Sequence, residues 1–216
     1  MSPSAPAKRR AVAYIDGYNI YHAIRDTHRK DYQWLNLWDA ARALLNSRDQ
    51  ELVAVKMFSA IAKHRPDSAA RHHIYNQALA SVGVEVILGN FKDRTTYCRY
   101  CKKSWPHPEE KESDVNLSIH LLRDCLRGDV DVAYIWSTDS DIAPAIRMAH
   151  GECKSTEFIT VAACQRPHSK DNLSACQNKS AKLTEKVIRR NLFPEIIRGA
   201  DGAQICVRPQ EYAPPY

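Results

Sequence analysis

The chain has 216 residues, of which 44% are apolar and 26% are charged, a balance that excludes a chain disordered throughout. Its length is that of one α/β domain, or of one domain with a short tail. The formal net charge of +6 permits a polyanionic partner such as nucleic acid without requiring one, and no apolar run is long enough to span a membrane.

Predicted strands and helices alternate along the sequence. In chain order, the hydrophobic pattern predicts a strand at 11–15, helices at 18–28 and 37–47, a strand at 52–58, a helix at 67–82 and a strand at 84–88. It continues with a helix at 113–127, a strand at 132–136, a helix at 140–149, a strand at 158–162, a helix at 181–192 and a strand at 203–207. This alternation predicts an α/β fold with a central, mostly parallel sheet and helices on both faces.

The predicted domain spans residues 10–200, between a flexible leader at 1–9 and a C-terminal tail at 201–216. An insertion at about 90–112 is longer than the usual connection from a strand to a helix, and such segments are often lids or binding loops. The apolar stretch that follows the N-terminal basic residues is too short for a secretory signal. We therefore expect a cytoplasmic protein whose seven cysteines stay reduced.

Four aspartates fall at the carboxyl edge of the predicted sheet. Asp16 ends the first strand, Asp139 and Asp141 follow the strand at 132–136, and Asp114 begins the helix after the insertion. Clustered carboxylates raise one another's pKa unless a cation neutralises them, and Mg²⁺ or Mn²⁺ takes oxygen ligands. Such a metal activates water and stabilises a phosphoryl transition state, so the cluster predicts metal-dependent hydrolysis of a phosphodiester. The alternative for each aspartate is a helix N-cap.

The acidic positions lie in three motifs: I-D-G-Y-N-I at 15–20, E-K-E-S-D-V at 110–115 and S-T-D-S-D-I at 137–142. In this order and spacing they resemble the NYN domain family, a branch of the PIN-like metal-dependent nucleases, and within it the LabA-like group. The resemblance implies a three-layer α/β/α PIN-like sandwich and a metal-dependent endoribonuclease that leaves 5′-phosphate and 3′-hydroxyl ends. The Mg²⁺ or Mn²⁺ ligands that it implies are Asp16, Asp114, Asp139 and Asp141.

The family's asparagine after the first aspartate matches Asn19, which the resemblance places among the catalytic residues. Its amide would orient Asp16 or a substrate phosphate, and the alternative is a local turn hydrogen bond to the backbone. Thr138 departs from the family's more usual glycine without removing a carboxylate. We therefore expect Thr138 to affect the rate more than the chemistry.

The insertion carries two further signals. Cys98 and Cys101 form a C-x-x-C pair, which is half of a zinc site, and His107 is a candidate third ligand; two reduced cysteines without metal are the alternative. Basic and aromatic residues alternate in the same segment, as in proteins that bind single-stranded nucleic acid, although a solvated loop would look similar. The candidate RNA-binding residues here and after the second strand are Lys63, Arg65, Arg94, Arg99, Lys102, Lys103 and Trp105.

Two other functions remain compatible with the sequence besides that of an endoribonuclease. One is a non-catalytic RNA-binding or regulatory protein that keeps the PIN-like fold, and the other is a nuclease or phosphatase that acts on DNA flaps. Retention of four aspartates favours an enzyme, because a surface that only binds phosphates gains nothing from unneutralised carboxylates. The expected partner is single-stranded or structured RNA, and a homodimer formed through exposed sheet edges is compatible with the sequence.

Overall fold

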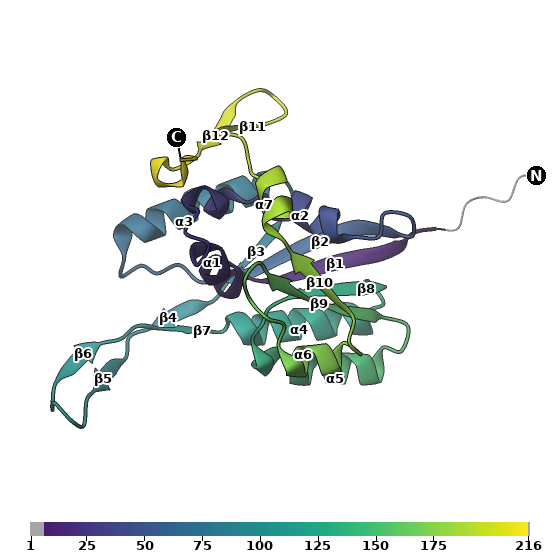
Figure 1. Ribbon diagram of the computed structural model, residues 1–216, viewed down its shortest axis with the longest axis horizontal. Coiled ribbons are helices and arrows are strands. Elements are labelled where there is room, and N and C mark those ends of the chain that lie inside the picture. The colour runs from purple at the N-terminus through teal and green to yellow at the C-terminus, as the bar shows by residue number, and fades with distance from the viewer. Residues whose placement is uncertain (1–6, 216) are drawn as a thin grey trace, which may run out of the picture.

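A six-stranded parallel sheet organises residues 7–215, the part of the chain that the computed structural model describes (Figure 1). In spatial order its strands are β3 (Glu85–Leu88), β2 (Gln50–Ser59), β1 (Arg9–Asp16), β8 (Val132–Trp136), β9 (Glu157–Ala163) and β10 (Ser180–Leu183). The chain winds outward from β1 to β3 and then returns to the other side of β1 as β8. The direction of winding therefore reverses between β1 and β8, and in open parallel sheets ligands bind at the carboxyl ends of the strands at this reversal.

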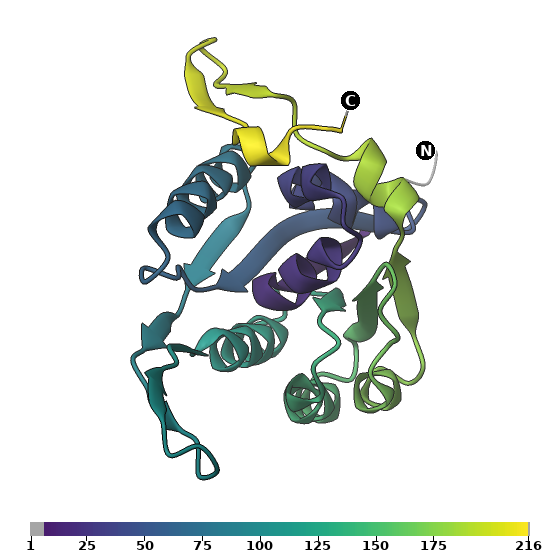
Figure 2. The ribbon, with the colours of Figure 1, turned by 60° about the vertical axis from the view of Figure 1, so that its left-hand side comes forward.

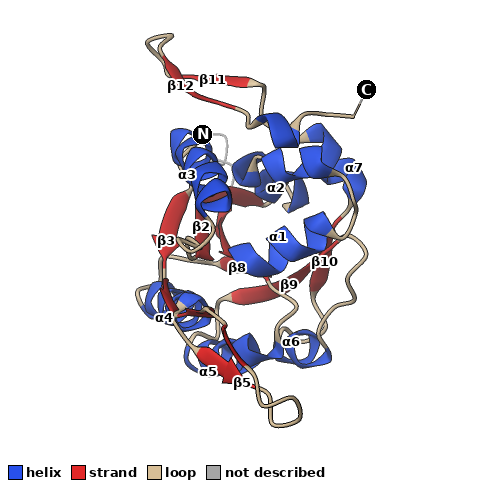
Figure 3. Ribbon diagram, turned by 90° about the vertical axis from the view of Figure 1, so that its left-hand side faces the viewer, coloured by secondary structure: helices blue, strands red, loops and turns tan. Residues whose placement is uncertain are grey.

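Helices cover both faces of the sheet (Figure 3). One face packs against α1 (Gly17–Arg25), α2 (Leu37–Leu44), α3 (Pro66–Ser81) and α7 (Glu185–Arg190). The other face packs against α4 (Ser113–Leu126), α5 (Ala143–Glu152) and α6 (Lys170–Ala175). The predicted three-layer α/β/α sandwich is confirmed. None of the helices among residues 7–215 has the length and apolar character needed to cross a membrane.

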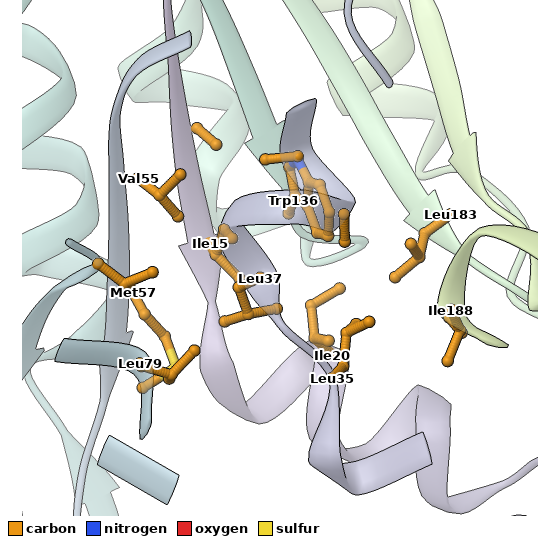
Figure 4. Packing of buried hydrophobic residues seen from close by; sticks show 14 of the residues in the cluster. Ile15, Ile20, Leu35, Leu37, Val55, Met57, Leu79, Trp136, Leu183 and Ile188 are labelled. Carbon is orange, nitrogen blue, oxygen red and sulfur yellow. The ribbon is translucent and has the colours of Figure 1, made fainter. Parts of the chain in front are cut away.

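Two hydrophobic clusters, one on each face of the sheet, form the core. Ile15 of β1 belongs to the cluster with α1, α2 and α3, whereas its neighbour Tyr14 belongs to the cluster with α4 and α5. Figure 4 shows the first cluster, in which Ile15, Met57 and Trp136 of the sheet lie near Leu37 of α2. Burial on both faces explains why these strands are continuous apolar runs in the sequence.

A charged pair lies inside the second cluster. The Lys56 ammonium is 2.6 Å from Asp124 Oδ2, and the Tyr14 hydroxyl donates to the same oxygen at 2.9 Å. Lys56 is 7% exposed and Asp124 is 5% exposed. Burial disfavours the charge on Asp124, but hydrogen bonds from Lys56 and Tyr14 outweigh it and hold the pKa of this carboxyl below its usual value. Each charge is therefore buried but paired, and removal of either partner would leave the other charge buried without its closest counter-charge.

The insertion forms an arm of antiparallel strands that projects from the body of the molecule (Figures 1 and 2). At its base β4 (Asn90–Lys92) pairs with β7 (Glu109–Lys111), and farther out β5 (Thr95–Tyr97) pairs with β6 (Ser104–Pro106). A second hairpin, β11 (Ile196–Arg198) and β12 (Gln204–Val207), lies beside α3. Three short 3-10 turns complete the structure: η1 (Lys30–Trp34), η2 (Ser140–Ile142) and η3 (Gln210–Tyr212).

Some predicted elements were wrong. The predicted helix at 181–192 is two elements, because β10 joins the sheet beside β9 and α7 begins only after Thr184, whose hydroxyl accepts from the Val187 N–H at 3.3 Å. Helix α6 was not predicted at all. The strand at 203–207 is real but belongs to the separate β11–β12 hairpin. Of the predicted leader at 1–9, residues 1–6 lie outside the part of the chain that the structure describes, and Arg9 belongs to β1.

Candidate active site at the carboxyl edge of the sheet

Asp16 occupies the junction between β1 and α1. Its Oδ1 accepts from the Asn19 backbone N–H at 2.9 Å and so caps α1, while its Oδ2 accepts from the Ser137 hydroxyl at 2.9 Å. The side chain is 6% exposed. Burial raises the pKa of Asp16 to about 6; the two hydrogen bonds oppose this rise, and the charges of Asp114 and Asp139 add to it. Asp16 is thus both a helix cap and a member of an acidic cluster.

Glycine at position 17 allows α1 to begin directly against β2. A Cβ at this position would lie 2.9 Å from the Phe58 carbonyl oxygen, closer than real Cβ atoms approach, and 3.0 Å from the Ser59 Cβ, which is also a tight contact. Any larger residue would push the first turn of α1 away from the sheet and would move the Asp16 cap with it. The close contact with β2 therefore explains why glycine follows Asp16 in the first motif.

Asp139 and Asp141 lie in the loop after β8. Asp139 is half-buried and its Oδ1 accepts from the Asp141 N–H at 3.0 Å, which caps η2, whereas Asp141 is exposed. The buried side chain of Asn172 holds this loop from α6: its Nδ2 donates to the carbonyls of Ser137 at 3.1 Å and Asp139 at 2.9 Å. The loop is therefore fixed by a residue distant in sequence.

Asp114 stands in the first turn of α4, where the arm returns to the body. Burial raises the pKa of Asp114, and the charges of Asp139, Glu110 and Asp141 raise it further. The residue before α4, Glu112, has a φ of 80°, in the left-handed region that side chains seldom adopt. The charge of Asp139 thus acts on the pKa of both Asp16 and Asp114, which places these three carboxylates near one another.

The Asn19 amide makes a different contact from those expected. Its Nδ2 donates to Thr138 Oγ1 at 3.1 Å, and its Oδ1 accepts from the Thr138 N–H at 3.2 Å. The side chain therefore links α1 to the loop after β8, and only the backbone of Asn19 contacts Asp16. Thr138, the departure from the family pattern, supplies a hydroxyl to this link that glycine would lack.

The four aspartates offer the right donors for a divalent cation. All are carboxylates, which suit Mg²⁺ or Mn²⁺; burial raises the pKa of Asp16 and of Asp114, and neighbouring carboxylates, whose charge a cation would neutralise, add to the rise. Within residues 7–215, however, no three His, Cys, Asp or Glu side chains stand close enough to hold a metal ion. The four carboxylates are ligands of the kind that such a metal prefers, but the side chains do not stand close enough together to coordinate it.

The predicted zinc site is likewise not assembled. Cys98 and Cys101 lie together in the turn at the tip of the arm, where the Cys101 N–H approaches Cys98 Sγ at 3.4 Å and backbone hydrogen bonds lower the pKa of the Cys98 thiol. His107 does not join them in any group of three metal-binding side chains in the described part of the chain. A further cysteine, Cys125, is buried in α4, and burial raises its pKa to about 12.

The predicted RNA-binding residues form two groups. Arg94, Arg99, Lys102, Lys103 and Trp105 lie on the arm, where Trp105 is 44% exposed and the neighbouring Tyr100 is 98% exposed. Arg94 is engaged with Glu109 at 2.8 Å. Lys63 and Arg65 are exposed in the loop that follows β2, at the same edge of the sheet as Asp16.

Sequence reasoning missed three residues that shape the site: Ser137, Asn172 and Glu110. Ser137 begins the S-T-D-S-D motif, but only the pairing of β1 with β8 brings its hydroxyl to Asp16. Asn172 lies outside the three motifs. Glu110 accepts from the Ser113 N–H at 3.2 Å and belongs to the second motif. Two of these residues stand in the motifs, but the contacts of Ser137 and Asn172 depend on the tertiary fold.

Comparison with known proteins gives three results. The family model for the NYN domain matches residues 10–183. The chain is 29% identical, over an alignment of 227 residues, to the 6-hydroxy-3-succinoylpyridine 3-monooxygenase HspA of Pseudomonas putida, with 81% of this chain and 71% of the relative covered. It is also similar to the crystal structure of a protein of unknown function from Vibrio parahaemolyticus, with a TM-score of 0.55, 19% identity and coverage of 84% of this chain and 97% of that one. The structural similarity shows a shared fold.

Proposed function

Because the chain belongs to the NYN domain family, we propose that it is a metal-dependent endoribonuclease that hydrolyses RNA phosphodiester bonds at the carboxylate cluster. The observation that carries the proposal is the placement of Asp16, Asp114 and Asp139 at the edge where the winding of the sheet reverses, where the charge of Asp139 adds to the rise that burial causes in the pKa of the other two. A purely structural set of helix caps would gain nothing from sharing one electrostatic environment.

The residues of the cluster differ in rigidity, which suggests different roles. Asp16 is fixed by the Asn19 N–H and the Ser137 hydroxyl, and Asp139 is fixed by the loop that Asn172 holds. Asp114 and the exposed Asp141 are freer, so they can adjust to the substrate phosphate and accept a hydrogen bond from the attacking water. Mg²⁺ or Mn²⁺, held by these carboxylates, would supply an activated water at neutral pH and neutralise charge on the phosphate.

The basic residues would offset the repulsion between the carboxylates and the RNA backbone. Lys63 and Arg65 lie at the same edge as the cluster and can contact phosphates directly. The arm adds Arg99, Lys102 and Lys103 together with exposed aromatic rings, on which unpaired bases can stack. In-line attack that expels the 3′ oxygen yields products with 5′-phosphate and 3′-hydroxyl ends.

The test is cleavage of end-labelled single-stranded and hairpin RNA, and of DNA of equal length, by the purified protein with Mn²⁺, with Mg²⁺ or with EDTA. Asp16→Asn and Asp139→Asn are compared with Asp129→Asn, an exposed aspartate before β8 at the opposite edge of the sheet. We expect metal-dependent RNA cleavage that both site variants lose and the control variant keeps. RNA binding without cleavage, unchanged in all three variants, would favour the non-catalytic alternative, and cleavage of DNA alone would favour the DNA-directed one.

The relative from Pseudomonas putida gives a second candidate function, oxygenation of a hydroxylated pyridine ring, favoured by 29% identity over most of this chain. A monooxygenase consumes dioxygen and two electrons, places one oxygen atom in the substrate and releases the other as water. Oxygen uptake with a hydroxypyridine carboxylate and a chemical reductant therefore tests it. Oxygen uptake that depends on the pyridine, in a protein that cleaves no RNA, would favour the monooxygenase and exclude the nuclease.

A further inference from the structure

A cavity of about 330 Å³ lies between α1 and α3, on the face of the sheet opposite α4. Ile15 and Met57 of the sheet contribute to its lining, and Phe91 and Pro108 at the base of the arm contribute to it as well. Its volume is within the range of pockets that bind small molecules. No residue of the carboxylate cluster lines it, so this cavity is a second feature of the same domain.

Aromatic rings from three separate elements line the cavity side by side. Tyr18 of α1 and Phe91 of β4 have ring centroids 6.1 Å apart at 74°, and His64, from the loop after β2, has its ring 5.1 Å from Phe91 at 69°. The Tyr18 hydroxyl donates to the Ala60 carbonyl at 2.8 Å, and the Tyr75 hydroxyl donates to the Leu35 carbonyl at 2.6 Å. With their hydroxyls bound to backbone, these tyrosines present ring surface to a ligand, and a planar ring packs well against such walls.

The charge of the cavity lining is positive. Arg25 and Arg65 are among the lining residues, and none of the described side chains that line the cavity is a carboxylate. His22 and His72 also line it, and burial lowers the pKa of both, that of His72 to about 4, so they are neutral donors and acceptors at pH 7. An anionic group would therefore meet the Arg65 guanidinium, and that of Arg25, which lies 3.9 Å from Asp26 just outside the lining.

The cavity also adjoins the candidate active site. Gly17 and Ser59 contribute to its lining; Gly17 follows Asp16 directly, and Ser59 is the last residue of β2. A ligand in the cavity therefore reaches the carboxyl edge where Asp16 lies, from the other side of the first turn of α1. Because Phe91 and Pro108 belong to the arm, the position of the arm sets the shape of the cavity.

We propose that this cavity binds a planar aromatic ring that carries an anionic group, with the ring against Tyr18 and Phe91 and the anion at Arg65. Two sources present this chemistry: one nucleotide of an RNA chain, which would rest on the proposed nuclease function, and a free aromatic acid, which would not. The cavity cannot select between them by charge, since a phosphate and a carboxylate both suit a guanidinium.

Isothermal titration calorimetry of the full chain in EDTA tests the proposal without requiring turnover. The ligands are uridine and adenosine 5′-monophosphates and 6-hydroxynicotinate, compared with uridine as a ring without charge and with inorganic phosphate and acetate as charges without a ring. We expect one saturable site for at least one ring-plus-anion ligand, bound about tenfold tighter than inorganic phosphate or acetate; for uridine monophosphate, binding should also be about tenfold tighter than that of uridine.

Variants locate the binding. Phe91→Leu and Arg65→Gln should each weaken it about tenfold, whereas Arg147→Gln on the exposed face of α5 should leave it unchanged. Thermal melts of each variant separate lost binding from lost folding. Preference for the nucleotides assigns the cavity to RNA, and preference for 6-hydroxynicotinate assigns it to a small aromatic acid.

Three results would overturn the proposal: no binding of any ring-plus-anion ligand, equal binding of uridine and its monophosphate, or binding that Phe91→Leu and Arg65→Gln both leave intact in folded protein. None of these results bears on RNA cleavage, which is measured separately with metal present. Failure of this proposal and failure of the nuclease proposal are therefore distinguishable.

Discussion

The Ser137 hydroxyl lies 2.9 Å from Asp16 Oδ2 and also accepts from the Asp139 N–H at 3.0 Å. One side chain therefore joins the last residue of β1 to the loop after β8, across the point where the winding of the sheet reverses. It connects two aspartates of the candidate active site without being acidic itself. The first prediction concerns this hydroxyl.

Ser137→Ala should slow RNA cleavage by about 10- to 100-fold, because it removes a hydrogen bond to a buried carboxylate. The same change should raise the pKa of Asp16 further, since this hydrogen bond now holds it down. Cleavage rates at saturating Mn²⁺ measure the effect, with the exposed Ser155→Ala as control. A Ser137→Ala protein that cleaves at the normal rate would remove Ser137 from the site.

Asp16→Asn should abolish cleavage and yet stabilise the metal-free protein at pH 7.5. The folded-state pKa of about 6 lies above the ordinary 3.8, so holding Asp16 ionised at this pH costs about 3 kcal/mol. Asparagine keeps the N-cap without the charge. The advantage should shrink between pH 6 and pH 4, as the folded wild-type protein takes up its proton. Urea unfolding in EDTA measures it, and a variant less stable than Asp129→Asn at pH 7.5 contradicts the argument.

His72 should make the protein less stable in mild acid. Burial, with a smaller effect of His73, lowers its pKa to about 4 from an ordinary 6.5. As the pH falls, His72 takes up a proton in the unfolded chain before it does so in the folded protein. The contribution of His72 to stability is therefore complete above pH 6.5 and is lost as the pH falls toward 4. At pH 5 the loss should be about 2 kcal/mol. Urea unfolding at pH 7.5 and pH 5 should show a smaller loss for His72→Gln, while the exposed His73→Gln should follow the wild type.

The arm should contribute to the salt dependence of RNA binding. Replacing Arg99, Lys102 and Lys103 with glutamine should reduce the slope of log K against log salt by about 2, because each phosphate contact on a single strand contributes about 0.7. Fluorescence anisotropy with a labelled single-stranded RNA over a range of KCl concentrations measures the slope. Replacement of Arg147, Arg189 and Arg190, exposed on α5 and α7, is the matched control. Equal slopes for the two triple variants would exclude the arm from phosphate contact.

The buried pair of Lys56 and Asp124 should respond differently to single and double changes. Lys56→Met leaves the Asp124 charge buried with Arg123 as its remaining cationic partner, and should cost about 3 kcal/mol of unfolding free energy. Lys56→Met combined with Asp124→Asn removes both charges and keeps an acceptor for the Tyr14 hydroxyl, so most of the stability should return. Chemical denaturation of the two variants checks this. A double variant no more stable than the single one would show that the charge of Asp124 itself contributes to the free energy of unfolding.

Prediction of the fold from sequence succeeded where strands were apolar on both faces, and at the edge strand β3, but failed at the other edge of the sheet, β10. Strand β10 is short, and its residues S-A-K-L have only one fully buried position, so they resemble the start of the helix that follows. Thr184, which caps α7, was the residue that could have separated the two elements. Helix α6 has six residues, too few for a helical period to stand out.

The position of the aspartates at one edge of the sheet was predictable for a different reason. Aspartates at the ends of two strands meet if the strands are parallel neighbours, and β1 and β8 are. What the sequence did not reveal are contacts made across the fold: Asn172 to the loop after β8, Asn19 to Thr138, and the arm to the cavity beside α1. Each joins segments far apart in the chain, and no local pattern predicts such a partner.

The pairing of β1 with β8 has a consequence during synthesis. Asp16 leaves the ribosome early, but its partner Asp139 follows only after β2, β3 and the whole arm, and Asn172, which holds the loop of Asp139, comes later still. A nascent chain therefore carries the basic and aromatic arm before it carries all four aspartates. Under the proposed nuclease function, messenger and ribosomal RNA near the exit tunnel would meet a chain with the arm but without the complete set of carboxylates until nearly the whole domain has emerged.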